Sequence, residues 1–398
     1  MKMLFKTTDD FDFEKKKVLL RVDINSPVFK KKILDNPRIK EASEMIKWLS
    51  LRKAKIAVIA HQGRKGDADF LSLKQHSKLI SKYLGKEIKY VDDLFSNKVI
   101  KEINNLREGD SVVLKNVREY KDEMDVSFPS NNFIDFSRNF DIYVNDAFSV
   151  SHRSQASIVI PPKIIPSCVG IHFIKEVCAL SNFDISRKGV FLIGGAKVED
   201  YLPIFNVLKN KENIVLASGV LANLLLLIEG IHLGYEEKWL KEKDYLRLIP
   251  QLKEILNNHR NQIILPVDFA FRKKGRIEKT LEDAPFEDKI LDVGKNTVVL
   301  FKKYIKGAKR IFMKGPLGFS ETPLFDYGTL EILKSIAEET KKGAFSLLGG
   351  GHLTTTVEKH LSKSAFSFIS VAGGALIAYL SGEELPGIKA LQESSRLF

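Results

Sequence analysis

Short runs of apolar residues alternate along the chain with longer segments in which apolar positions recur every three or four residues. The runs rich in Val and Ile predict strands, and the longer amphipathic segments predict helices. The strands expected in the first half are residues 18–22, 55–60, 89–91, 112–116 and 141–145. Those expected in the second half are residues 190–193, 213–217, 262–266, 310–313, 345–348 and 366–370. Because these runs are apolar almost throughout, they indicate parallel strands covered by helices on both faces.

The clearest predicted helix covers residues 37–52. Asn36 stands at its N-cap and Pro37 at its first position, and apolar residues such as Ile39 and Leu49 share one face. An N-cap asparagine followed by proline is a typical helix start.

Three prolines, Pro161, Pro162 and Pro166, separate the two halves, and a helical pattern follows them from about residue 168 to 180. We therefore predict an α/β protein of two doubly wound, Rossmann-like parallel-sheet domains joined by a hinge helix. The expected bounds are residues 1–165 for the first domain, 166–182 for the connector helix and 183–385 for the second domain.

Charge and composition narrow the class of protein. The 398 residues include 63 Lys and Arg against 50 Asp and Glu, a net charge of +13 that favours anionic partners. The basic residues are spread along the chain, and no aromatic stacking motif accompanies them, which argues against nucleic-acid binding.

Two cysteines, Cys168 and Cys178, cannot form a disulfide framework or a four-cysteine zinc site, and the eight histidines include no HExxH pattern. No apolar stretch reaches the roughly 20 residues that span a bilayer. Residues 1–12 lack the apolar core of a signal peptide. We therefore expect a cytoplasmic protein without a membrane partner.

Polar residues follow the strands of the first half, where ligands bind in open parallel sheets. These residues are Asp23, Asn25, His61, Arg64, Arg118 and Arg153, and Arg38 lies at the start of the helix over residues 37–52. Arginine supplies only 15 of the 63 basic residues, so its use here suggests planar, bidentate anion binding. Four converging arginines would form a strong phosphate pocket. Each arginine alone could equally cap a helix or pair with a surface acid, and His61 could be hydrogen-bonded scaffold.

Glycine takes the corresponding positions in the second half. Four turns each follow an apolar strand and precede a helical pattern: Gly194-Gly195, Gly315, Gly349-Gly350-Gly351 and Gly373-Gly374. Glycine lets the backbone approach a phosphate closely, and a following helix N-terminus favours negative charge. Helix packing would explain any one turn, whereas four on one sheet edge indicate a nucleotide. The chain has no GxxxxGK[ST] motif and no GxGxxG after the first strand of either half. Because the first half has arginine-rich strand ends and the second half has glycine-rich ones, we predict phosphoryl transfer between ligands held on two domains.

An ordered series of motifs resembles those of the phosphoglycerate kinase family. In the first half they are residues 21–27 (RVDINSP), 61–64 (HQGR), 116–118 (NVR), 144–148 (VNDAF) and 152–153 (HR). In the second half they are residues 194–198 (GGAKV), 265–268 (LPVD), 315–321 (GPLGFSE), 349–352 (GGGH) and 385–387 (LPG). The match covers nearly the whole chain, and the short loops and His352 are similar to the archaeal branch of the family.

The resemblance implies reversible phosphoryl transfer between 1,3-bisphosphoglycerate and ADP, giving 3-phosphoglycerate and ATP with Mg²⁺. It implies that phosphoglycerate is held by Asp23, Asn25, Arg38, His61, Arg64, Arg118 and Arg153. It implies that Arg38 and Lys197 act in catalysis, and that nucleotide is contacted by Lys197, Glu321, Gly350, Gly351, His352 and Leu353. It also implies that the C-terminal segment, residues 386–398, returns to the first domain, and that the protein is a monomer or homodimer.

Some positions depart from the family pattern. A second lysine of many members is Tyr201 here, an asparagine near the phosphates is Lys314, and an aspartate near the metal is His352. Val371-Ala372 replaces a hydroxyl-bearing residue and a glycine. We expect Lys314 to supply positive charge to the nucleotide in place of the missing lysine, whereas a solvated lysine is the simpler alternative. The departures leave the metal ligands unassigned. They also leave open a second function, a binding or regulatory protein that transfers phosphoryl groups poorly.

Overall fold

The computed structural model describes residues 5–184 and 187–398. The chain divides into two compact units, one formed by Met1–Cys178 with Glu383–Phe398 and the other by Ala179–Gly382. We call them unit 1 and unit 2 and describe each by itself. The chain leaves unit 1 within helix α7 (Ile171–Asn182).

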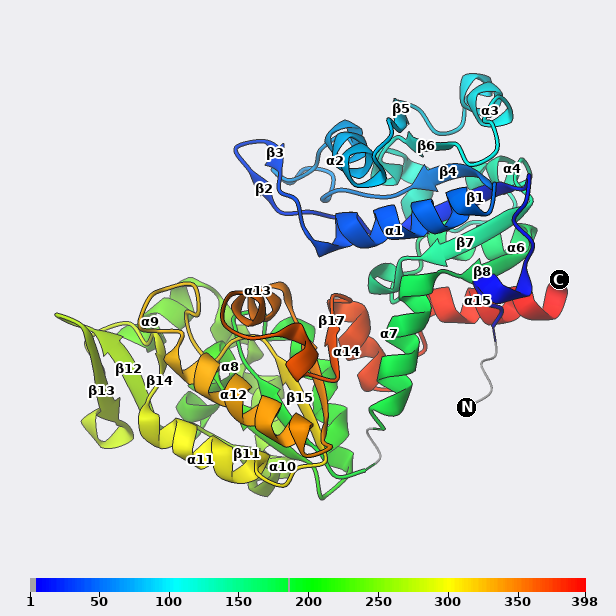
Figure 1. Cartoon of the computed structure of the whole chain (residues 1–398). Coiled ribbons are helices and arrows are strands. Elements are labelled where there is room, and N and C mark those ends of the chain that lie inside the picture. Colours follow the sequence, from blue (N-terminus) through cyan, green and yellow to red (C-terminus); the bar gives the residue numbers. More distant parts are fainter. Residues whose placement is uncertain (1–4, 185–186) are drawn as a thin grey trace. The chain divides into compact units, whose positions relative to one another are not determined.

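Unit 1 contains a six-stranded sheet of order β5-β6-β4-β1-β7-β8 in which all neighbours are parallel (Figure 1). Its strands are β1 (Lys17–Val22), β4 (Lys55–Ile59), β5 (Lys89–Val91), β6 (Ser111–Leu114), β7 (Ile142–Asp146) and β8 (Ser167–Val169). The chain moves from β1 to one side through β4, β5 and β6, and then crosses to the other side for β7 and β8. The strand order therefore reverses between β1 and β7, which is where doubly wound sheets bind ligands.

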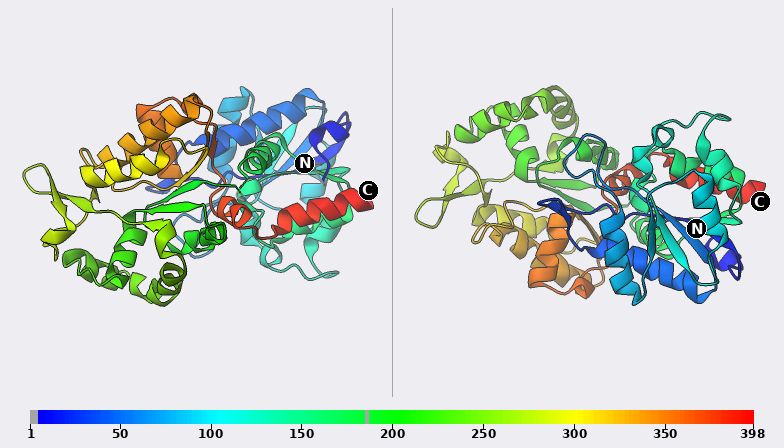
Figure 2. Two further views of the ribbon diagram at one scale, coloured as in Figure 1. Left: turned by 90° about the horizontal axis from the view of Figure 1, so that it is seen from below. Right: turned by 90° about the horizontal axis from the view of Figure 1, so that it is seen from above.

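Helices cover both faces of this sheet (Figure 2). Successive strand residues point to opposite faces, and apolar residues on both faces are buried in core clusters. Leu20 and Ile56 belong to one core cluster, and Leu19 and Ala57 to another. The first cluster includes α1 (Pro37–Leu51) and α2 (Lys74–Leu84). The second includes α3 (Asn97–Asn104), α4 (Asn132–Ser137), α5 (Ala156–Val159) and α15 (Pro386–Leu397). Short helices complete the unit: α6 (Pro161–Ile164), η1 (Thr8–Asp10), η2 (Val117–Glu119), η3 (Lys121–Met124) and η4 (Phe148–Val150).

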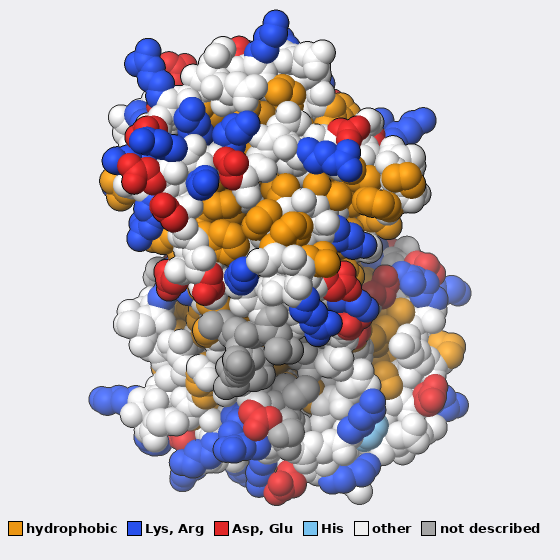
Figure 3. Space-filling model, turned by 90° about the vertical axis from the view of Figure 1, so that its right-hand side faces the viewer, with side chains coloured by type: hydrophobic (Ala, Val, Ile, Leu, Met, Phe, Trp, Pro, Cys, Tyr) orange, Lys and Arg blue, Asp and Glu red, His pale blue; other side chains and the backbone are white. Residues whose placement is uncertain are grey.

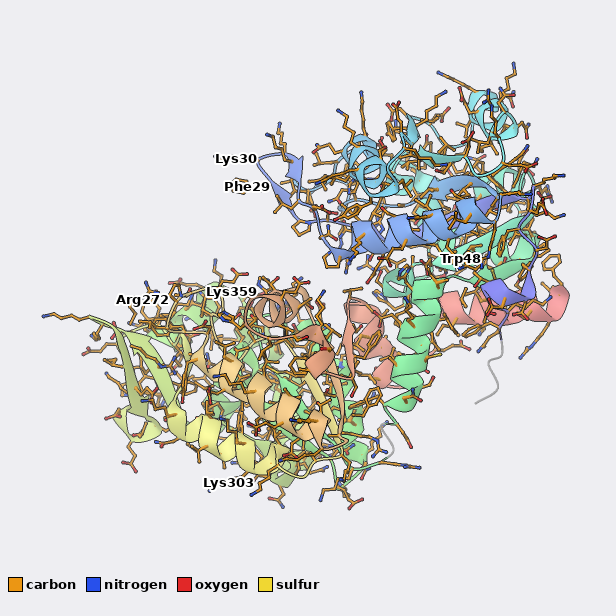
Figure 4. All side chains as sticks on the ribbon, viewed as in Figure 1. Phe29, Lys30, Trp48, Arg272, Lys303 and Lys359 are labelled. Atoms are coloured by element: carbon orange, nitrogen blue, oxygen red, sulfur yellow. The ribbon has the colours of Figure 1, made fainter. Side chains whose placement is uncertain are left out.

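A two-stranded antiparallel hairpin, β2 (Val28–Phe29) and β3 (Lys32–Ile33), lies between β1 and α1. Gln75 of α2 holds it, because Gln75 Oε1 accepts the Ile33 N–H (3.1 Å) and Gln75 Nε2 donates to the Lys31 carbonyl (3.0 Å). Phe29 and Lys30 stand at its tip (Figure 4). The sequence pattern did not predict this hairpin, because strands of two residues are too short to show a period.

The helix predicted over residues 166–182 is wrong at its start. Ser167–Val169 form β8, which pairs with β7, and α7 begins at Ile171. A buried run of three residues does not distinguish strand from helix by periodicity. At the other end of the chain, α15 packs in unit 1, where the Gly387 N–H donates to the Ser151 carbonyl (2.9 Å).

Unit 2 contains a second parallel sheet, of order β11-β10-β9-β15-β16-β17. Its strands are β9 (Val190–Ile193), β10 (Ile214–Ala217), β11 (Ile263–Ile264), β15 (Arg310–Lys314), β16 (Phe345–Gly349) and β17 (Phe368–Ser370). The strand order reverses between β9 and β15. The expected α/β class with two doubly wound parallel sheets is therefore confirmed.

Leu192 and Met313 face one core cluster of unit 2, formed with α11 (Lys295–Ile305), α12 (Tyr327–Lys341) and α13 (Gly351–His360). On the opposite face the Phe191 and Phe312 rings pack against Phe183, with centroids 5.9 and 6.2 Å apart. The remaining helices are α8 (Gly219–Ile228), α9 (Tyr235–Glu242), α10 (Ile249–His259), α14 (Gly374–Leu380), η5 (Glu199–Lys209), η6 (Tyr245–Leu248), η7 (Arg260–Gln262), η8 (Leu281–Asp283) and η9 (Lys363–Ala365).

A small antiparallel sheet of order β13-β12-β14 stands at one end of unit 2 (Figure 1). Its strands are β12 (Asp268–Arg272), β13 (Arg276–Thr280) and β14 (Asp292–Val293). The sequence pattern missed it, because residues 272–280 are mostly charged and carry no apolar run. None of the helices among the described residues is long and apolar enough to cross a membrane.

Asp146, the last residue of β7, anchors the first turn of α7 to unit 1. Its Oδ1 accepts the N–H groups of His172 (2.8 Å) and Phe173 (2.9 Å), and its Oδ2 lies 2.8 Å from His172 Nδ1. His172 Nε2 lies 3.2 Å from Glu44 Oε2 on α1. Burial disfavours the charged imidazole, but the hydrogen bond and charge of Asp146, with Glu41 and Glu44, raise the pKa of His172 overall. The protonated histidine therefore ties α7 to α1.

We expect His172→Gln to lower the free energy of unfolding more at pH 6 than at pH 8.5. Because the folded-state pKa is raised, the contribution is fully present below the ordinary pKa of about 6.5 and is lost as pH rises through the folded pKa. A hydrogen bond to a charged group is worth roughly 1.5–3 kcal/mol. Urea unfolding at both pH values measures this, and His232→Gln, an exposed histidine, is the control. An equal loss at both pH values would contradict the charged pairing.

Candidate functional site

Asp23 follows β1 directly and lies at the reversal point of unit 1. Its carboxylate accepts hydrogen bonds from the Asn25 N–H (2.9 Å) and the Ser149 hydroxyl, and its Oδ2 lies 3.2 Å from Arg38 Nη1. Burial alone would raise the pKa of Asp23, but the charge of Arg38, with His61 and these hydrogen bonds, lowers it to about 2. The carboxylate is therefore ionised at neutral pH and orients Arg38.

Arg38 lies in the first turn of α1 because the helix begins at Pro37, as predicted. Asn36 Oδ1 accepts the Arg38 N–H (3.0 Å). The guanidinium also donates from Nη1 to the Asn25 carbonyl (3.2 Å), so the side chain is tied to the loop after β1. The side chain keeps 26% of its surface exposed, which leaves room for contact with an anion.

Two amides join the loops that follow β1 and β4. Asn25 Oδ1 accepts the Gly63 N–H (2.8 Å). Gln62 is fully buried, and its Oε1 accepts the Ser26 N–H (2.8 Å) while its Nε2 donates to the Ser26 carbonyl (3.0 Å). Gln62 thus sets the spacing of the two loops. Sequence reasoning does not identify Gln62 as a site residue, and the available signal is its place directly after His61.

His61 is buried beside a second residue that the sequence did not identify, Arg21. The Arg21 side chain is fully buried, donates from Nε to Ser157 Oγ (3.1 Å), and lies with Nη2 3.2 Å from His61 Nδ1. The Ser157 hydroxyl in turn donates to Glu123 (2.9 Å). Burial, then the charge of Arg21, holds the pKa of His61 well below its usual range. Because a guanidinium only donates, the neutral imidazole accepts at Nδ1 and carries its proton on Nε2.

The arginines that follow the other strands form a positive cluster around this histidine. Arg118 donates from Nη1 to the Gly63 carbonyl (2.7 Å). Burial, then the charges of Arg21 and Arg153, lowers the pKa of Arg118 to about 10. Arg153 donates from Nε to the neighbouring His152 ring (3.2 Å), and Arg64 is exposed and forms no ion pair with any residue that the structure describes. The cluster has the charge and donors to bind a phosphorylated or carboxylate ligand.

The strand ends of unit 2 approach one another through glycine. The Gly194 N–H after β9 donates to the Lys314 carbonyl at the end of β15 (2.8 Å), and the Gly315 N–H donates to the Gly349 carbonyl at the end of β16 (3.3 Å). A Cβ on Gly194 would lie 2.3 Å from the Pro316 carbonyl oxygen, so only glycine fits there. These turns expose backbone at the reversal point between β9 and β15.

Lys197 and the first turn of α13 supply the remaining groups of this edge. Lys197 is exposed and makes no ion pair within residues 5–184 and 187–398. Gly350 has φ +116°, which glycine adopts readily, and precedes α13, whose first residue is Gly351. Leu353 is buried in the core, so only its backbone can face a ligand. Glu321 Oε1 lies 2.5 Å from His352 Nδ1, and both side chains are largely exposed.

The sequence profile named Phosphoglycerate kinase matches residues 8–383. The chain belongs to the phosphoglycerate kinase family.

Relatives in this family match over nearly their whole length. A phosphoglycerate kinase of Methanothermus fervidus is 38% identical, with 98% of each chain covered. One of Sulfolobus acidocaldarius is 37% identical, covering 98% of this chain and 97% of the relative. The crystal structure of phosphoglycerate kinase from Pyrococcus horikoshii OT3 superposes with a TM-score of 0.89 at 33% identity, covering 98% of this chain and 100% of that one. The predicted resemblance to archaeal members is thus confirmed.

Two positions that depart from the phosphoglycerate kinase pattern, Tyr201 and Lys314, have different neighbours. Burial, then the charge of Asp200, raises the pKa of Tyr201 to about 12, and its hydroxyl lies 3.8 Å from a Cβ placed on Gly195. Lys314 is buried and donates from Nζ to the Gly373 carbonyl (3.1 Å), with its stem over Gly349. These contacts do not support the expectation that the Lys314 ammonium takes the place of the lysine that is missing at position 201.

Gly194→Ala should lower the free energy of unfolding by about 1–3 kcal/mol, because its Cβ would meet the Pro316 backbone and overpacking costs this much. It should also displace the turn after β15 and weaken ATP binding. Gly275→Ala, in the turn between β12 and β13, is the matched control, since a Cβ there meets open space. Thermal unfolding and calorimetric titration with ATP measure both effects. Wild-type stability in Gly194→Ala would show that the turn has room to adjust.

Proposed function

We propose that this chain catalyses the reversible transfer of a phosphoryl group between 1,3-bisphosphoglycerate and ADP, giving 3-phosphoglycerate and ATP in glycolysis and gluconeogenesis. The match to the phosphoglycerate kinase family over residues 8–383 carries this proposal, because both candidate half-sites lie within it. The full-length relatives favour this enzyme over a regulatory protein on the same scaffold.

In this proposal unit 1 binds the phosphoglycerate. Arg64, Arg118 and Arg153 contribute cations for its phosphate and carboxylate, and neutral His61 donates from Nε2. Arg38, oriented by Asp23 and the loop of Asn25, meets the phosphoryl group that is transferred. The support is geometric: Asp23 and Asn25 hold Arg38, and Arg118 shares a positive field with Arg153 and Arg64.

Unit 2 binds the nucleotide. Lys197, the one candidate cation of this edge that is exposed, contacts phosphate beside the backbone of Gly350 and Gly351. Lys314 adds charge at the end of β15, Glu321 contacts the ribose, and His352 and the Leu353 backbone complete the first turn of α13. The N–H groups of that turn favour an anion.

The chemistry needs no general base. An acyl phosphate carries a good leaving group and the attacking ADP oxygen is already anionic, so positioning and charge neutralisation suffice. Arg38 and Lys197 supply that neutralisation from the two units. One chain contains both half-sites, and the protein is proposed to be a monomer or homodimer.

We propose that Mg²⁺ enters with the nucleotide, held mainly by its phosphate oxygens. Mg²⁺ commonly needs only one or two protein carboxylates beside phosphate and water. Among the described residues no group of three or more His, Cys, Asp or Glu side chains could hold a metal ion. Bound there, Mg²⁺ neutralises phosphate charge. Glu321 is a carboxylate at this edge that could contact the cation, but its Oε1 is already bonded to His352.

The distribution of charge on the surface bears on whether nucleic acid is a partner. On the face shown in Figure 3, Lys and Arg side chains are interspersed with Asp and Glu, with no continuous basic stripe for nucleic acid. We propose a cytoplasmic enzyme whose ligands are small phosphorylated molecules.

A coupled assay with 3-phosphoglycerate, ATP and Mg²⁺ tests the function, and Arg38→Ala should lower kcat about 100- to 1,000-fold. One donor that stabilises developing charge is worth roughly 3–4 kcal/mol in a closed site. Arg138→Ala, which removes an exposed arginine paired with Asp135, should keep wild-type rates. No turnover by folded wild-type protein would refute the function. Near-normal turnover by Arg38→Ala would refute the place of transfer.

Lys314→Met should raise the KM for ATP or slow transfer about tenfold, because a charge-assisted contact is worth roughly 1.5–3 kcal/mol. Methionine keeps the stem over Gly349 and removes the ammonium group, with its charge and its hydrogen bond to the Gly373 carbonyl. Lys303→Met, on α11 (Figure 4), is the matched control. Steady-state kinetics at low salt, where charges are least screened, gives the clearest reading. Unchanged ATP kinetics would leave Lys314 a structural cation.

A further inference from the structure

Residues 315–326 connect β15 to α12 and carry Glu321, and their conformation needs support from outside the segment. Leu324 has φ +74°, a region that a residue with a branched side chain rarely adopts. Its side chain is 58% exposed, so burial of its own apolar group does not hold it there. The Glu321 side chain is 71% exposed and lies against His352. We call residues 315–326 the Glu321 loop.

Arg276 of the small antiparallel sheet holds this loop by its backbone. Its Nη1 donates to the Leu324 carbonyl (2.8 Å) and to Asp292 Oδ2 (2.8 Å), and its Nη2 donates to the Val293 carbonyl (2.7 Å). Its Nε donates to Glu278 Oε1 (3.1 Å). The guanidinium thus uses its planar fork on four acceptors, which a lysine could not reproduce.

Cations of the same region also lie over aromatic rings of the loop and of Tyr327, the first residue of α12. Arg272, at the end of β12, lies 5.3 Å from the ring centroid of Phe325, which is 1% exposed (Figure 4). Arg276 lies 4.9 Å from the ring of Tyr327, and Lys289 lies 4.7 Å from that of Phe319. Such contacts contribute roughly 0.5–2 kcal/mol each. Cations therefore contact the loop on both sides of Glu321, at Phe319 before it and at Phe325 after it.

Asp292 and its neighbour Leu291 join the segment before β14 to the start of α12 and to the loop. Its Oδ2 accepts the Gly328 N–H (2.8 Å), and the neighbouring Leu291 carbonyl accepts the Phe319 N–H (2.8 Å). Burial raises the pKa of Asp292 to about 6, even though the Arg276 charge and hydrogen bonds oppose the rise. The carboxylate needs Arg276 to stay ionised near neutral pH, so the two side chains act together.

We propose that Arg276 is a positioning residue for the nucleotide site: it fixes the Glu321 loop and thereby the place of Glu321 beside His352 and the ribose. In this proposal Arg276 acts through the loop and does not itself contact the substrate. The proposal rests on the ribose role proposed for Glu321. It gives the small antiparallel sheet a part in nucleotide recognition beyond its packing in unit 2.

The first arm of the test is Arg276→Lys, which keeps the charge and loses the fork. Steady-state kinetics should show the KM for ATP raised about tenfold, with the KM for 3-phosphoglycerate unchanged and kcat little affected. A purely structural arginine would instead lower stability and leave the KM for ATP alone. Arg260→Lys is the matched control, since Arg260 also pairs with a carboxylate and a backbone carbonyl, Glu229 and Ile263, and should keep both KM values.

The second arm is a double-mutant cycle with Glu321→Gln. If Arg276 acts through Glu321, the double variant should have a KM for ATP no higher than the worse single variant. Additive increases would overturn the proposal. Should Arg276→Lys fail to fold, Tyr327→Leu removes the stacked ring and keeps the four hydrogen bonds, and it should show the same pattern at smaller size.

Hydrogen exchange separates this proposal from the role of Glu321. Arg276→Lys should speed amide exchange of residues 318–328, whether or not Glu321 binds ribose. Unchanged exchange there would overturn the positioning role. Faster exchange together with a wild-type KM for ATP in Glu321→Gln would refute the ribose contact and leave the hold of Arg276 on the loop established.

Discussion

Both main sheets are parallel throughout, and this constraint decides where each unit can bind a ligand. In a parallel sheet every strand ends at the same edge, and the helices that follow begin there with N–H groups that have no partner within the helix. The strand order reverses between β1 and β7 in unit 1 and between β9 and β15 in unit 2, so loops diverge at those points. Asp23 follows β1 and Gly194 follows β9. Two different chemistries therefore occupy equivalent places, cations in one unit and bare backbone in the other.

The cations of unit 1 have an energetic cost without a ligand. Arg21 is fully buried, and the mutual repulsion of Arg21, Arg118 and Arg153 contributes to the lowered pKa of Arg118. Asp23 and Glu123 offset part of this charge. An anion bound among the arginines would remove repulsion that the fold otherwise carries, so substrate should stabilise unit 1 by linkage as well as by its direct contacts. The low pKa of Asp23 has the same origin, because its carboxylate is the anion nearest to Arg38.

The sequence predicted those features that depend on local pattern. It gave the long apolar strands, the helix start at Pro37, the polar strand ends and the glycine turns, because each is determined by neighbouring residues. It missed β8, the β2–β3 hairpin and the small sheet, whose strands are too short or too charged to show a period. Within the site it missed Arg21 and Gln62, since burial of a polar side chain depends on partners distant in sequence, such as Ser157. The direction of the Lys314 ammonium is likewise set by Gly373, 59 residues away.

This difference between local and distant determinants also separates the two kinds of recognition in unit 2. The phosphate contacts proposed there need little beyond glycine turns and a helix N-terminus. Both are local features, so they can be identified from the sequence. The ribose contact that we propose for Glu321 depends on a loop in which Leu324 has a positive φ, and Arg276, which holds that loop, comes from another sheet. Arg276 lies 48 residues from Leu324 in the chain and 16 from Asp292. A segment such as β13, polar and without a period, can therefore determine ligand geometry while showing no functional motif of its own.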